Sequence, residues 1–542
     1  MGKQPAVFVR EATGLVRSIS APTAYVFAIA NTNFLWSLFF VATMFPQIGT
    51  PTDLLGGAVL AFLGVALITY IYYQFAYLAP RTGGDYVWLS RWLHPSLGFI
   101  SAVMGVVLME FLYIGVGAIT IQSTGFSILL AMVGTLLNNP GLVALAPLLI
   151  TPVNNFILAT IEIWVPSIAV ILGTRYYFKI QNIIYVPCIL IMLVLLGVMA
   201  GTSSTQFSVA FNSYSQQYTN STNYYQDIIS AATKSGWTLP TTSLMHMLMI
   251  MTLLIPVVAF GLVSYMGGEM KNTRRTWAAG LFGGSLSYVV WQAGASLLAY
   301  SAFGYAFLSA LGYNLYSNPS AVTLPALPYL NYLAAITVRN YPGGVILVVL
   351  LSLSVLQSIW YTPAAVMAVS RAFFGFSFDR LAPASLSSVS ERFNSPINAV
   401  LITLIGSELV LLIVAIPVTA TYAYYIYSVG LLIAIPFPFT LLGITAIAYP
   451  YRFKAEYAQG PIKGSFAGLP KLVWAGMGTV VFTLVAIYLL LTQPIFGANS
   501  PTGLSVAGGG LVVAVLLYVI ARVVRTRQGI DLKVAYAQIP PE

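Results

Sequence analysis

The most informative property of this 542-residue chain is how little charge it carries. Asp, Glu, Lys and Arg make up 7% of its residues, against roughly 25% in a typical soluble domain. In contrast, 58% of the residues are hydrophobic, and long apolar runs recur along the sequence. About 20 apolar residues cross a bilayer as a helix. The composition therefore excludes a soluble protein and predicts an integral membrane protein.

Residue types that carry enzymatic chemistry are also scarce. Cys188 is the only cysteine, which excludes an intrachain disulfide. The two histidines, His94 and His246, lie far apart, and no cluster has the spacing of metal ligands. A Gly-rich phosphate loop of the Walker type is absent, which argues against an ATP-driven pump. We expect no enzymatic activity, no metal and no cofactor other than a coupling ion, because catalysis needs convergent reactive groups.

The apolar runs predict an all-α membrane protein with twelve transmembrane helices. The expected spans lie near residues 20–45, 54–79, 97–130, 157–174, 179–200, 243–266, 277–304, 343–372, 397–416, 420–448, 470–492 and 504–524. With the N-terminus in the cytoplasm, all of the 23 Lys and Arg residues except Lys234 and Arg339 fall on the cytoplasmic side. This asymmetry is typical of a multi-pass protein with both ends inside the cell. The net charge of +10 thus reflects topology in the cell membrane and does not indicate a nucleic-acid partner.

Two of the expected spans contain helix-breaking or polar residues in mid-span. Ala30 to Asn33 reads ANTN in the first span, and Pro256 and Gly261 interrupt the sixth. Irregular backbone at membrane depth is tolerated where it is buried in protein or lines a water-filled cavity. Interruptions at matching positions of two five-span halves indicate an inverted-repeat transporter. We divide the chain into a cytoplasmic segment (1–19), a first repeat (20–200), an outer loop (201–242), a second repeat (243–448), two added spans (449–524) and a cytoplasmic tail (525–542).

Three acidic residues fall within expected spans, where a charge costs at least about 2.5–3.5 kcal/mol. Glu110 lies near mid-depth in an early span, and we interpret it as a site for a substrate amine or a proton, the alternative being a protonated packing carboxyl. Glu162 lies close to the outer end of its expected span, which favours an interfacial role, and Glu408 is interpreted as a packing residue. Hydroxyls of the eighth span, such as Ser358 and Thr362, could coordinate sodium or could bond to their own helix.

Three cytoplasmic motifs resemble those of the amino acid–polyamine–organocation transporters. They are PRTGGDYVWLSR with HPSLGF at residues 80–99, GEMKNTRR at 268–275, and SR at 370–371 followed by FDRLAP at 378–383 and SPINA at 395–399. The motifs occur in order at the span positions of that family. The resemblance implies a leucine-transporter-type fold, with two inverted five-helix repeats, two C-terminal helices, and discontinuous first and sixth helices.

The resemblance also implies a substrate site at the two interruptions. The backbone around Ala30, Asn31, Thr32 and Asn33 would bind a substrate carboxylate, and Val257, Val258, Ala259, Phe260 and Gly261 would receive its amine. Half-helix ends carry partial charges suited to this task. The family's glycine-rich break is replaced here by Asn-Thr-Asn, and Cys188 stands where some members carry a coupling lysine. Glu110, Cys188, Ser358 and Thr362 are therefore the coupling-ion candidates, for protons or for sodium.

The charged ends of several spans predict an inner gate. We expect ion pairs among Asp85, Glu269, Arg275 and Arg371, the alternative being that they anchor helix ends in the interface. Together these features predict a secondary transporter of amino acids or related organic amines, whose partners are a small-molecule substrate and the lipid bilayer. A polyamine or cationic-amine transporter with Glu110 as counter-charge is an alternative within the class, and a non-transporting amino-acid sensor is an alternative outside it.

Overall fold

The computed structural model describes residues 14–32, 44–255, 262–271, 273–353, 358–416, 429–460, 462, 464–532, 536, 538 and 539. The described chain is mainly helical. Asn33 and Val257 to Gly261, which the sequence places in the substrate site, lie outside the described residues.

The elements follow one another in the order of the expected spans. The first half contains α1 (Ala21–Asn31), α3 (Phe45–Ile48), α4 (Pro51–Leu78), α5 (Gly84–Trp92), α6 (Pro95–Ala102), η2 (Val103–Leu108), α7 (Met109–Ile121), η3 (Gln122–Phe126), α8 (Ser127–Leu136), α9 (Pro140–Leu148), α10 (Pro152–Ile171) and α11 (Thr174–Ala200). After these come α12 (Ser204–Ser215), α13 (Tyr224–Lys234), α14 (Leu244–Leu253), η4 (Gly267–Glu269), α16 (Thr273–Trp277), η5 (Ala278–Gly283), α17 (Gly284–Ala299), η6 (Tyr300–Gly304), α18 (Tyr305–Ser317), η7 (Pro319–Ala321) and α19 (Leu330–Val338).

The last third of the chain completes the helical body. It contains α20 (Gly344–Ser352), α22 (Tyr361–Phe378), η8 (Ala384–Ser387), α23 (Ile397–Ala415), η9 (Ile435–Thr440), α26 (Leu441–Arg452), α27 (Lys454–Gln459), β1 (Ser465–Phe466), β2 (Leu469–Pro470), α28 (Lys471–Thr492), η10 (Pro494–Phe496) and α29 (Pro501–Arg527). The strands β1 and β2 form a small antiparallel hairpin, with Ser465 opposite Pro470.

Within the described residues, nine helices are long and apolar enough to cross a bilayer. They are Pro51–Leu78, Pro95–Leu136, Pro152–Ile171, Thr174–Ala200, Arg274–Ser317, Ile397–Ala415, Val429–Arg452, Lys471–Thr492 and Pro501–Arg527. Each overlaps one of the expected spans. The helix Arg274–Ser317 is longer than the expected span at 277–304, because regular structure continues through the π-helical turn η6.

The other three expected spans, the first, sixth and eighth, contain helix ends. The helix α1 ends at Asn31, and α14 ends at Leu253, just before Pro256. The eighth span was expected to be one helix over 343–372, and this expectation was wrong. Its first helix, α20, ends at Ser352, and a separate helix, α22, begins at Tyr361. The stretch between these helices contains Ser354, Gln357 and Ser358, but the apolar residues around them predicted one continuous helix.

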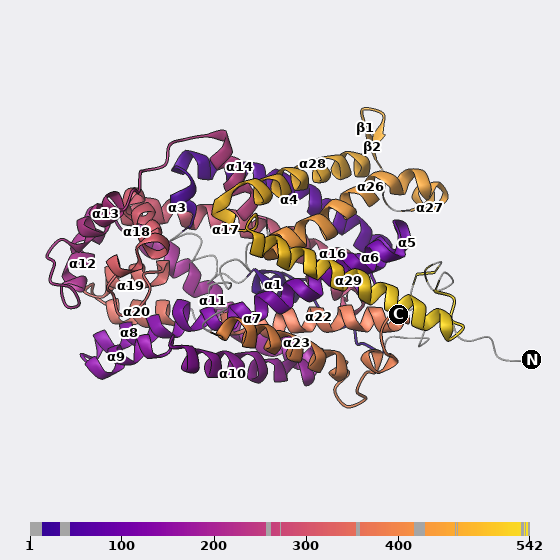
Figure 1. Cartoon of the computed structure of the whole chain (residues 1–542), viewed down its shortest axis with the longest axis horizontal. Helices are drawn as coiled ribbons and strands as arrows, with labels where there is room; N and C mark the ends of the chain where they lie inside the picture. Colours follow the sequence, from indigo (N-terminus) through magenta and orange to yellow (C-terminus); the bar gives the residue numbers. More distant parts are fainter. Residues whose placement is uncertain are drawn as a thin grey trace, which may run out of the picture.

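The long segments that the sequence assigns to the outer side contain helices that pack on one another. The Tyr225 and Phe307 rings stack at 4.4 Å between α13 and α18, and Asn314 of α18 donates to the Ile228 carbonyl oxygen at 2.8 Å. Residues 201–242, which we expected to form an outer loop, therefore contain the two helices α12 and α13. The α12, α13 and α18 helices lie together at one end of the molecule, opposite the end formed by α5 and α27 (Figure 1).

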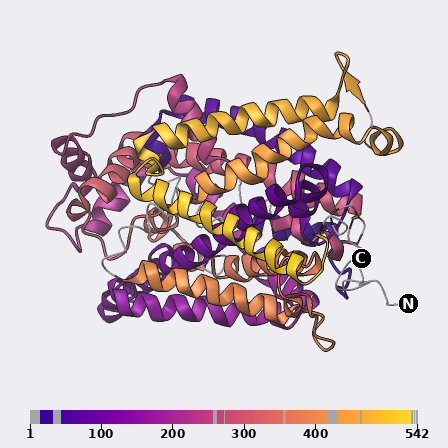
Figure 2. The same cartoon turned by 45° about the vertical axis from the view of Figure 1, so that its right-hand side comes forward.

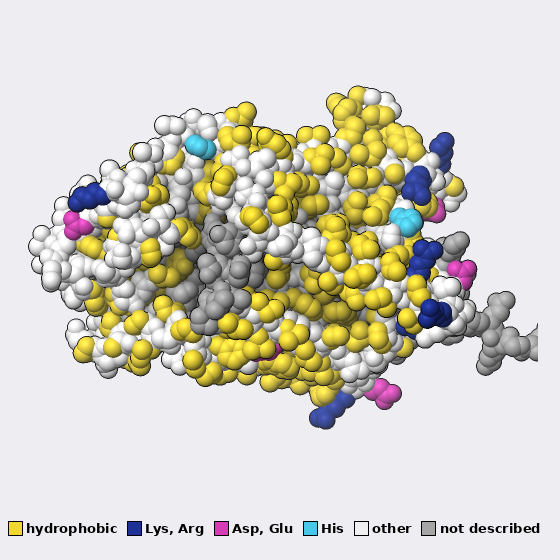
Figure 3. Space-filling view, viewed as in Figure 1, with side chains coloured by type: hydrophobic (Ala, Val, Ile, Leu, Met, Phe, Trp, Pro, Cys, Tyr) yellow, Lys and Arg dark blue, Asp and Glu magenta, His cyan; other side chains and the backbone are white. Residues whose placement is uncertain are grey.

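The distribution of side chains on the surface is typical of a membrane protein, with basic residues at one end. Hydrophobic side chains cover the middle of the molecule, and Lys and Arg side chains gather at the end opposite α12 and α13 (Figure 3). Two views show α10 and α23 running side by side and α29 lying obliquely across the outside of the bundle (Figures 1 and 2). The long helix α29 is mostly exposed, as expected for a helix that faces lipid.

Candidate functional site

The end of α1 presents one unsatisfied polar atom inside the protein. The Asn31 amide donates to the Phe27 carbonyl oxygen at 2.7 Å, but the buried Asn31 Oδ1 atom has no hydrogen-bond partner among the residues that the structure describes. The Thr32 hydroxyl donates to the Ile29 carbonyl oxygen at 2.8 Å. The Ala30 carbonyl oxygen accepts from the Tyr185 hydroxyl of α11 at 3.1 Å. Since a buried polar atom without a partner is costly, Asn31 Oδ1 is available to a ligand.

Two buried carboxyl groups accept hydrogen bonds from residues at the start of α22. Glu110 Oε2 accepts from the Tyr361 hydroxyl at 2.9 Å, and Glu162 Oε1 accepts from the Thr362 hydroxyl at 2.7 Å. The other oxygen of each carboxyl group is buried and has no hydrogen-bond partner in the described part of the chain. Glu110 is the second residue after the π-helical segment η2, and such segments often occur at functional sites. Tyr361 and Thr362 thus connect α22 to α7 and α10.

The structure corrects the interpretation of Glu162. The helix α10 begins at Pro152, earlier than the expected start at residue 157, so Glu162 lies near its middle and is buried. An interfacial role therefore does not fit its position. Glu408 is a different case, because its carboxyl group is only partly buried and accepts from the Thr160 hydroxyl at 2.7 Å and from the Trp164 indole at 3.1 Å. This packing contact joins α10 to α23.

The two remaining coupling-ion candidates are buried. Ser358 lies just before α22, and Cys188 is a buried free thiol on α11. Of the four candidates, Glu110 and Thr362 both take part in hydrogen bonds at the start of α22. Glu110 accepts from Tyr361, and Thr362 donates to Glu162. Among the described residues, no group of three or more His, Cys, Asp or Glu side chains is arranged to hold a metal ion.

A buried ion pair joins the sixth and eighth spans near the basic end of the molecule. Glu269 Oε1 and Arg371 Nε lie 2.8 Å apart, and both side chains are 0% exposed. The Thr174 hydroxyl, at the start of α11, donates to Glu269 Oε2, and Arg371 Nη2 lies 3.2 Å from the Thr174 oxygen. Buried charges persist when they are paired and fully hydrogen-bonded, and this cluster meets that condition across three elements.

The same cluster holds the beginning of the first span. The backbone amides of Ser18 and Ile19 donate to the Glu269 carbonyl oxygen at 2.9 and 3.0 Å, and the Lys271 amide donates to the Ile19 carbonyl oxygen at 3.0 Å. The segment that precedes α1 therefore pairs with the segment that follows the sixth span. A displacement of Glu269 would move both.

The other two residues of the expected inner gate have different surroundings. Asp85 is buried, and its Oδ2 atom accepts from the Tyr72 hydroxyl at 2.7 Å. Burial raises the pKa of Asp85 to about 6, although the hydrogen bond from Tyr72 acts in the opposite direction. Arg275 is exposed and forms no ion pair with another residue that the structure describes. The structure thus brings Glu269 and Arg371 together but does not bring Asp85 or Arg275 into their ion pair.

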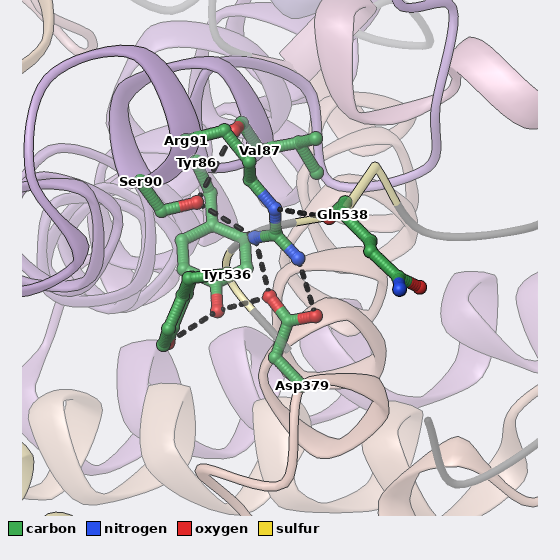
Figure 4. Close-up of polar contacts among 7 residues, drawn as sticks. All are labelled: Tyr86, Val87, Ser90, Arg91, Asp379, Tyr536 and Gln538. Carbon is green, nitrogen blue, oxygen red and sulfur yellow. Dashed lines mark hydrogen bonds and ion pairs between the residues drawn. The ribbon is translucent and has the colours of Figure 1, made fainter. Parts of the chain in front are cut away.

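A second buried ion pair, which the sequence analysis missed, lies close by (Figure 4). Arg91 of α5 donates through Nη1 and Nη2 to the two carboxylate oxygens of Asp379, both at 2.6 Å. The Tyr86 hydroxyl donates to Asp379 Oδ2 at 2.6 Å, and the Tyr536 ring lies 4.9 Å from the Arg91 guanidinium carbon. Burial lowers the pKa of Arg91, but Asp379 together with Tyr86 and Tyr536 raises it, so its pKa lies above the usual value.

The three sequence motifs therefore converge in space. Thr82 of the first motif forms an isolated antiparallel bridge with Met266, next to the second motif. Arg91 of the first motif pairs with Asp379 of the third, while Glu269 of the second pairs with Arg371 of the third. The pairing of Arg91 with Asp379 could have been suspected, because both residues lie within motif segments. Spacing along the chain could not show that they meet.

Comparison with known proteins agrees with this geometry. The family model described as "Amino acid permease" matches residues 19–520, which include all three motifs and both buried ion pairs. The chain belongs to the amino acid permease family. Members of this family are transporters and not enzymes, so the expectation of a non-enzymatic membrane transporter is confirmed. A search of curated proteins finds no match to this amino acid permease.

Proposed function

We propose that this permease is a secondary active transporter that moves amino acids or related organic amines across the cell membrane by alternating access. The observation that carries the proposal is the family match over residues 19–520. It is supported by the end of α1 at Asn31, where a buried amide oxygen has no hydrogen-bond partner within the described structure. In the proposed topology the chain crosses the membrane twelve times, as two inverted five-helix repeats plus two helices, and both termini are cytoplasmic.

The proposed substrate site lies between the interrupted first and sixth spans. Asn31 Oδ1 and the neighbouring backbone of Ala30 to Asn33 contact the substrate from one side, and Val257 to Gly261 contact it from the other. Partial charges at half-helix ends suit the carboxylate and ammonium groups of an amino acid. Phe260 covers the ligand as a gate. The Glu269–Arg371 pair closes the cytoplasmic side, because it joins the segment after the sixth span to α22.

One observation favours the cationic-amine alternative. Glu110 Oε1 is buried and accepts no hydrogen bond from any described residue, so the carboxyl group could serve as counter-charge for a substrate ammonium. A Glu110→Gln change that abolishes uptake of cationic but not neutral substrates would support this alternative. Equal uptake of both classes by the variant would remove Glu110 from substrate recognition.

The experiment that tests the proposed function is uptake into proteoliposomes. Purified permease would be offered a panel of radiolabelled amino acids and amines, with a sodium gradient, a proton gradient, or unlabelled substrate inside for exchange. We expect saturable uptake of one chemical class. Asn31→Ala should raise the substrate KM, whereas Asn154→Ala, a change at an exposed asparagine of α10, should leave it unchanged. Specific binding without uptake under all three conditions would favour a sensor.

A further inference from the structure

Glu162 has surroundings that a purely structural carboxyl group does not need. It lies near the middle of a membrane-crossing helix, is 5% exposed, and receives one hydrogen bond, from Thr362. Its second oxygen, Oε2, is buried without a hydrogen-bond partner among the described residues. An apolar pair would pack α10 against α22 at lower cost, since a buried polar atom without a hydrogen bond is destabilising.

Two opposing influences act on the charge of this carboxyl group. Burial in a low-dielectric interior disfavours the charged form. The Thr362 hydroxyl and the start of α22 favour it, because a helix N-terminus carries a partial positive charge. The helix α22 is 18 residues long, and Thr362 is its second residue. A modest change in solvent access at this point would therefore change whether Glu162 holds a proton.

The titratable groups on the helices packed against α10 have other surroundings in the described structure. The two other carboxyl groups accept hydrogen bonds, Glu110 from Tyr361 and Glu408 from Thr160 and Trp164, and Arg371 pairs with Glu269. On α11, the Tyr177 hydroxyl donates to Gln181, the Tyr185 hydroxyl donates to the Ala30 carbonyl oxygen, and Cys188 is a buried thiol. Tyr113 is partly buried on α7, and three residues of α11 are exposed: Arg175, Tyr176 and Lys179. No described cation lies within ion-pair distance of Glu162. Its one described polar partner is Thr362.

We propose that Glu162 is a proton-binding site of the transport cycle, distinct from Glu110, and that Thr362 transmits its protonation state to α22. The inference rests on the proposed transport function. Glu162 takes a proton from water on one side of the membrane and releases it to water on the other. In the described conformation Glu162 is buried, which favours the neutral carboxyl group. When α10 and α22 move apart, water reaches Glu162 and stabilises its carboxylate form, so the proton is released.

The helix α22, which carries Thr362, is the moving element of the proposal. It is a separate helix from α20, since α20 ends at Ser352 and α22 begins at Tyr361. Backbone interrupted at membrane depth is tolerated where it is buried in protein or lines a cavity. Arg371, further along α22, belongs to the buried pair with Glu269. A movement of α22 would thus change both the surroundings of Glu162 and the contact that closes the cytoplasmic side.

The test compares Glu162→Gln with Glu408→Gln in proteoliposomes. Both changes neutralise a carboxyl group on the same α10–α23 pair of helices, but Glu408 lies on the partly exposed side and accepts two hydrogen bonds. We expect Glu162→Gln to lose about tenfold or more of the accumulation driven by a proton gradient, within the usual range of coupling energies. Exchange of labelled for unlabelled substrate should persist, and substrate-induced proton uptake, read by a trapped pH dye, should disappear. Glu408→Gln should resemble the wild type in all three assays.

Two further variants separate proton binding from packing. Thr362→Val keeps the carboxyl group and removes its hydrogen-bond donor, so the midpoint of the pH dependence of uptake should move to higher pH, and Thr362→Ser should restore it. If Glu162→Gln does not fold, this pair still tests the proposal, because an unchanged midpoint in Thr362→Val would contradict it.

The outcomes also separate this inference from the proposed function. Wild-type protein that shows neither uptake nor exchange would overturn the transport proposal itself. Normal exchange together with normal proton-driven accumulation in Glu162→Gln would overturn only the role of Glu162. Accumulation that follows a sodium gradient and is lost in Glu162→Gln would assign the site to sodium and overturn the proton assignment.

Discussion

Glu269 and Arg371 form an ion pair with 2.8 Å between Glu269 Oε1 and Arg371 Nε, inside a protein that presents neither side chain to solvent. The pair connects the segment after the sixth span with α22, and Glu269 also holds the segment before α1 through its backbone carbonyl oxygen. Three parts of the chain that alternating access would move relative to one another therefore meet at one residue, Glu269. In the function that we propose, this contact closes the cytoplasmic side.

Neutralising one partner of this pair should open the cytoplasmic side and destabilise the protein. Glu269→Gln leaves the Arg371 charge buried without a counter-charge, which typically costs about 3–5 kcal/mol. We expect a lower Tm, reduced uptake and faster labelling of cysteines introduced on the cytoplasmic side of α22. Lys271→Gln, a change at an exposed neighbour, serves as control. Wild-type uptake and labelling in Glu269→Gln would show that the pair does not act as a gate.

The Arg91–Asp379 pair should contribute mainly to stability. Asp379→Asn removes the charge that faces two Arg91 nitrogens at 2.6 Å, and we expect a loss of about 3 kcal/mol or more in the free energy of unfolding. Tyr86→Phe removes one hydrogen bond to Asp379 and should cost about 1–2 kcal/mol.

Denaturant or thermal unfolding of the purified protein measures both effects. Arg527→Gln, at an exposed position near the end of α29, provides the control for a change of surface charge. Equal stability of Asp379→Asn and the control would contradict the assignment of a stabilising pair.

Asp85 should make stability depend on pH in a definite direction. Its pKa in the folded protein is about 6 because it is buried, whereas an exposed Asp has a pKa of about 3.9. The folded state therefore holds the Asp85 proton more tightly than the unfolded state. The stabilisation is complete below pH 4 and is lost as pH rises from about 4 to about 6. Asp85→Asn should flatten the Tm profile in this window and should be more stable than the wild type at pH 7.

Glu391→Gln, at an exposed acidic position, should leave that profile unchanged. A Tm profile of Asp85→Asn parallel to that of the wild type between pH 4 and pH 6 would contradict the prediction.

Gly84 should not tolerate a side chain. Its φ is +47°, and a Cβ atom would lie 2.3 Å from the Ser264 hydroxyl oxygen, where the first motif packs against the end of the sixth span. We expect Gly84→Ala to destabilise the protein by about 2 kcal/mol or more, from backbone strain and overpacking. Gly508→Ala is the matched control, because no atom lies within 4 Å of its Cβ position. Thermal unfolding compares the two variants, and equal Tm values would argue against close packing at Gly84.

Much of the fold could be predicted because membrane helices depend on local properties. A long apolar run must satisfy its backbone hydrogen bonds within a helix, so composition and span length predicted helices that overlap the nine long helices observed. The end of α1 at Asn31 was also expected, since ANTN breaks an apolar run. The separate start of α22 at Tyr361 was not expected, because the few polar residues before it lie within a mainly apolar segment.

The candidate site, like the fold, was predicted only in part from the sequence. The sequence by itself determined which polar residues lie in apolar spans, and the three motifs determined the family, since both depend on residue type and local order. Only the tertiary structure decided their partners: Glu162 with Thr362, Glu269 with Arg371 and Thr174, and Arg91 with Asp379. The members of each pair are separated by about one hundred residues or more, and local spacing carries no information about such distant contacts. They form because each buried charge or polar group needs a hydrogen-bonding partner from another helix.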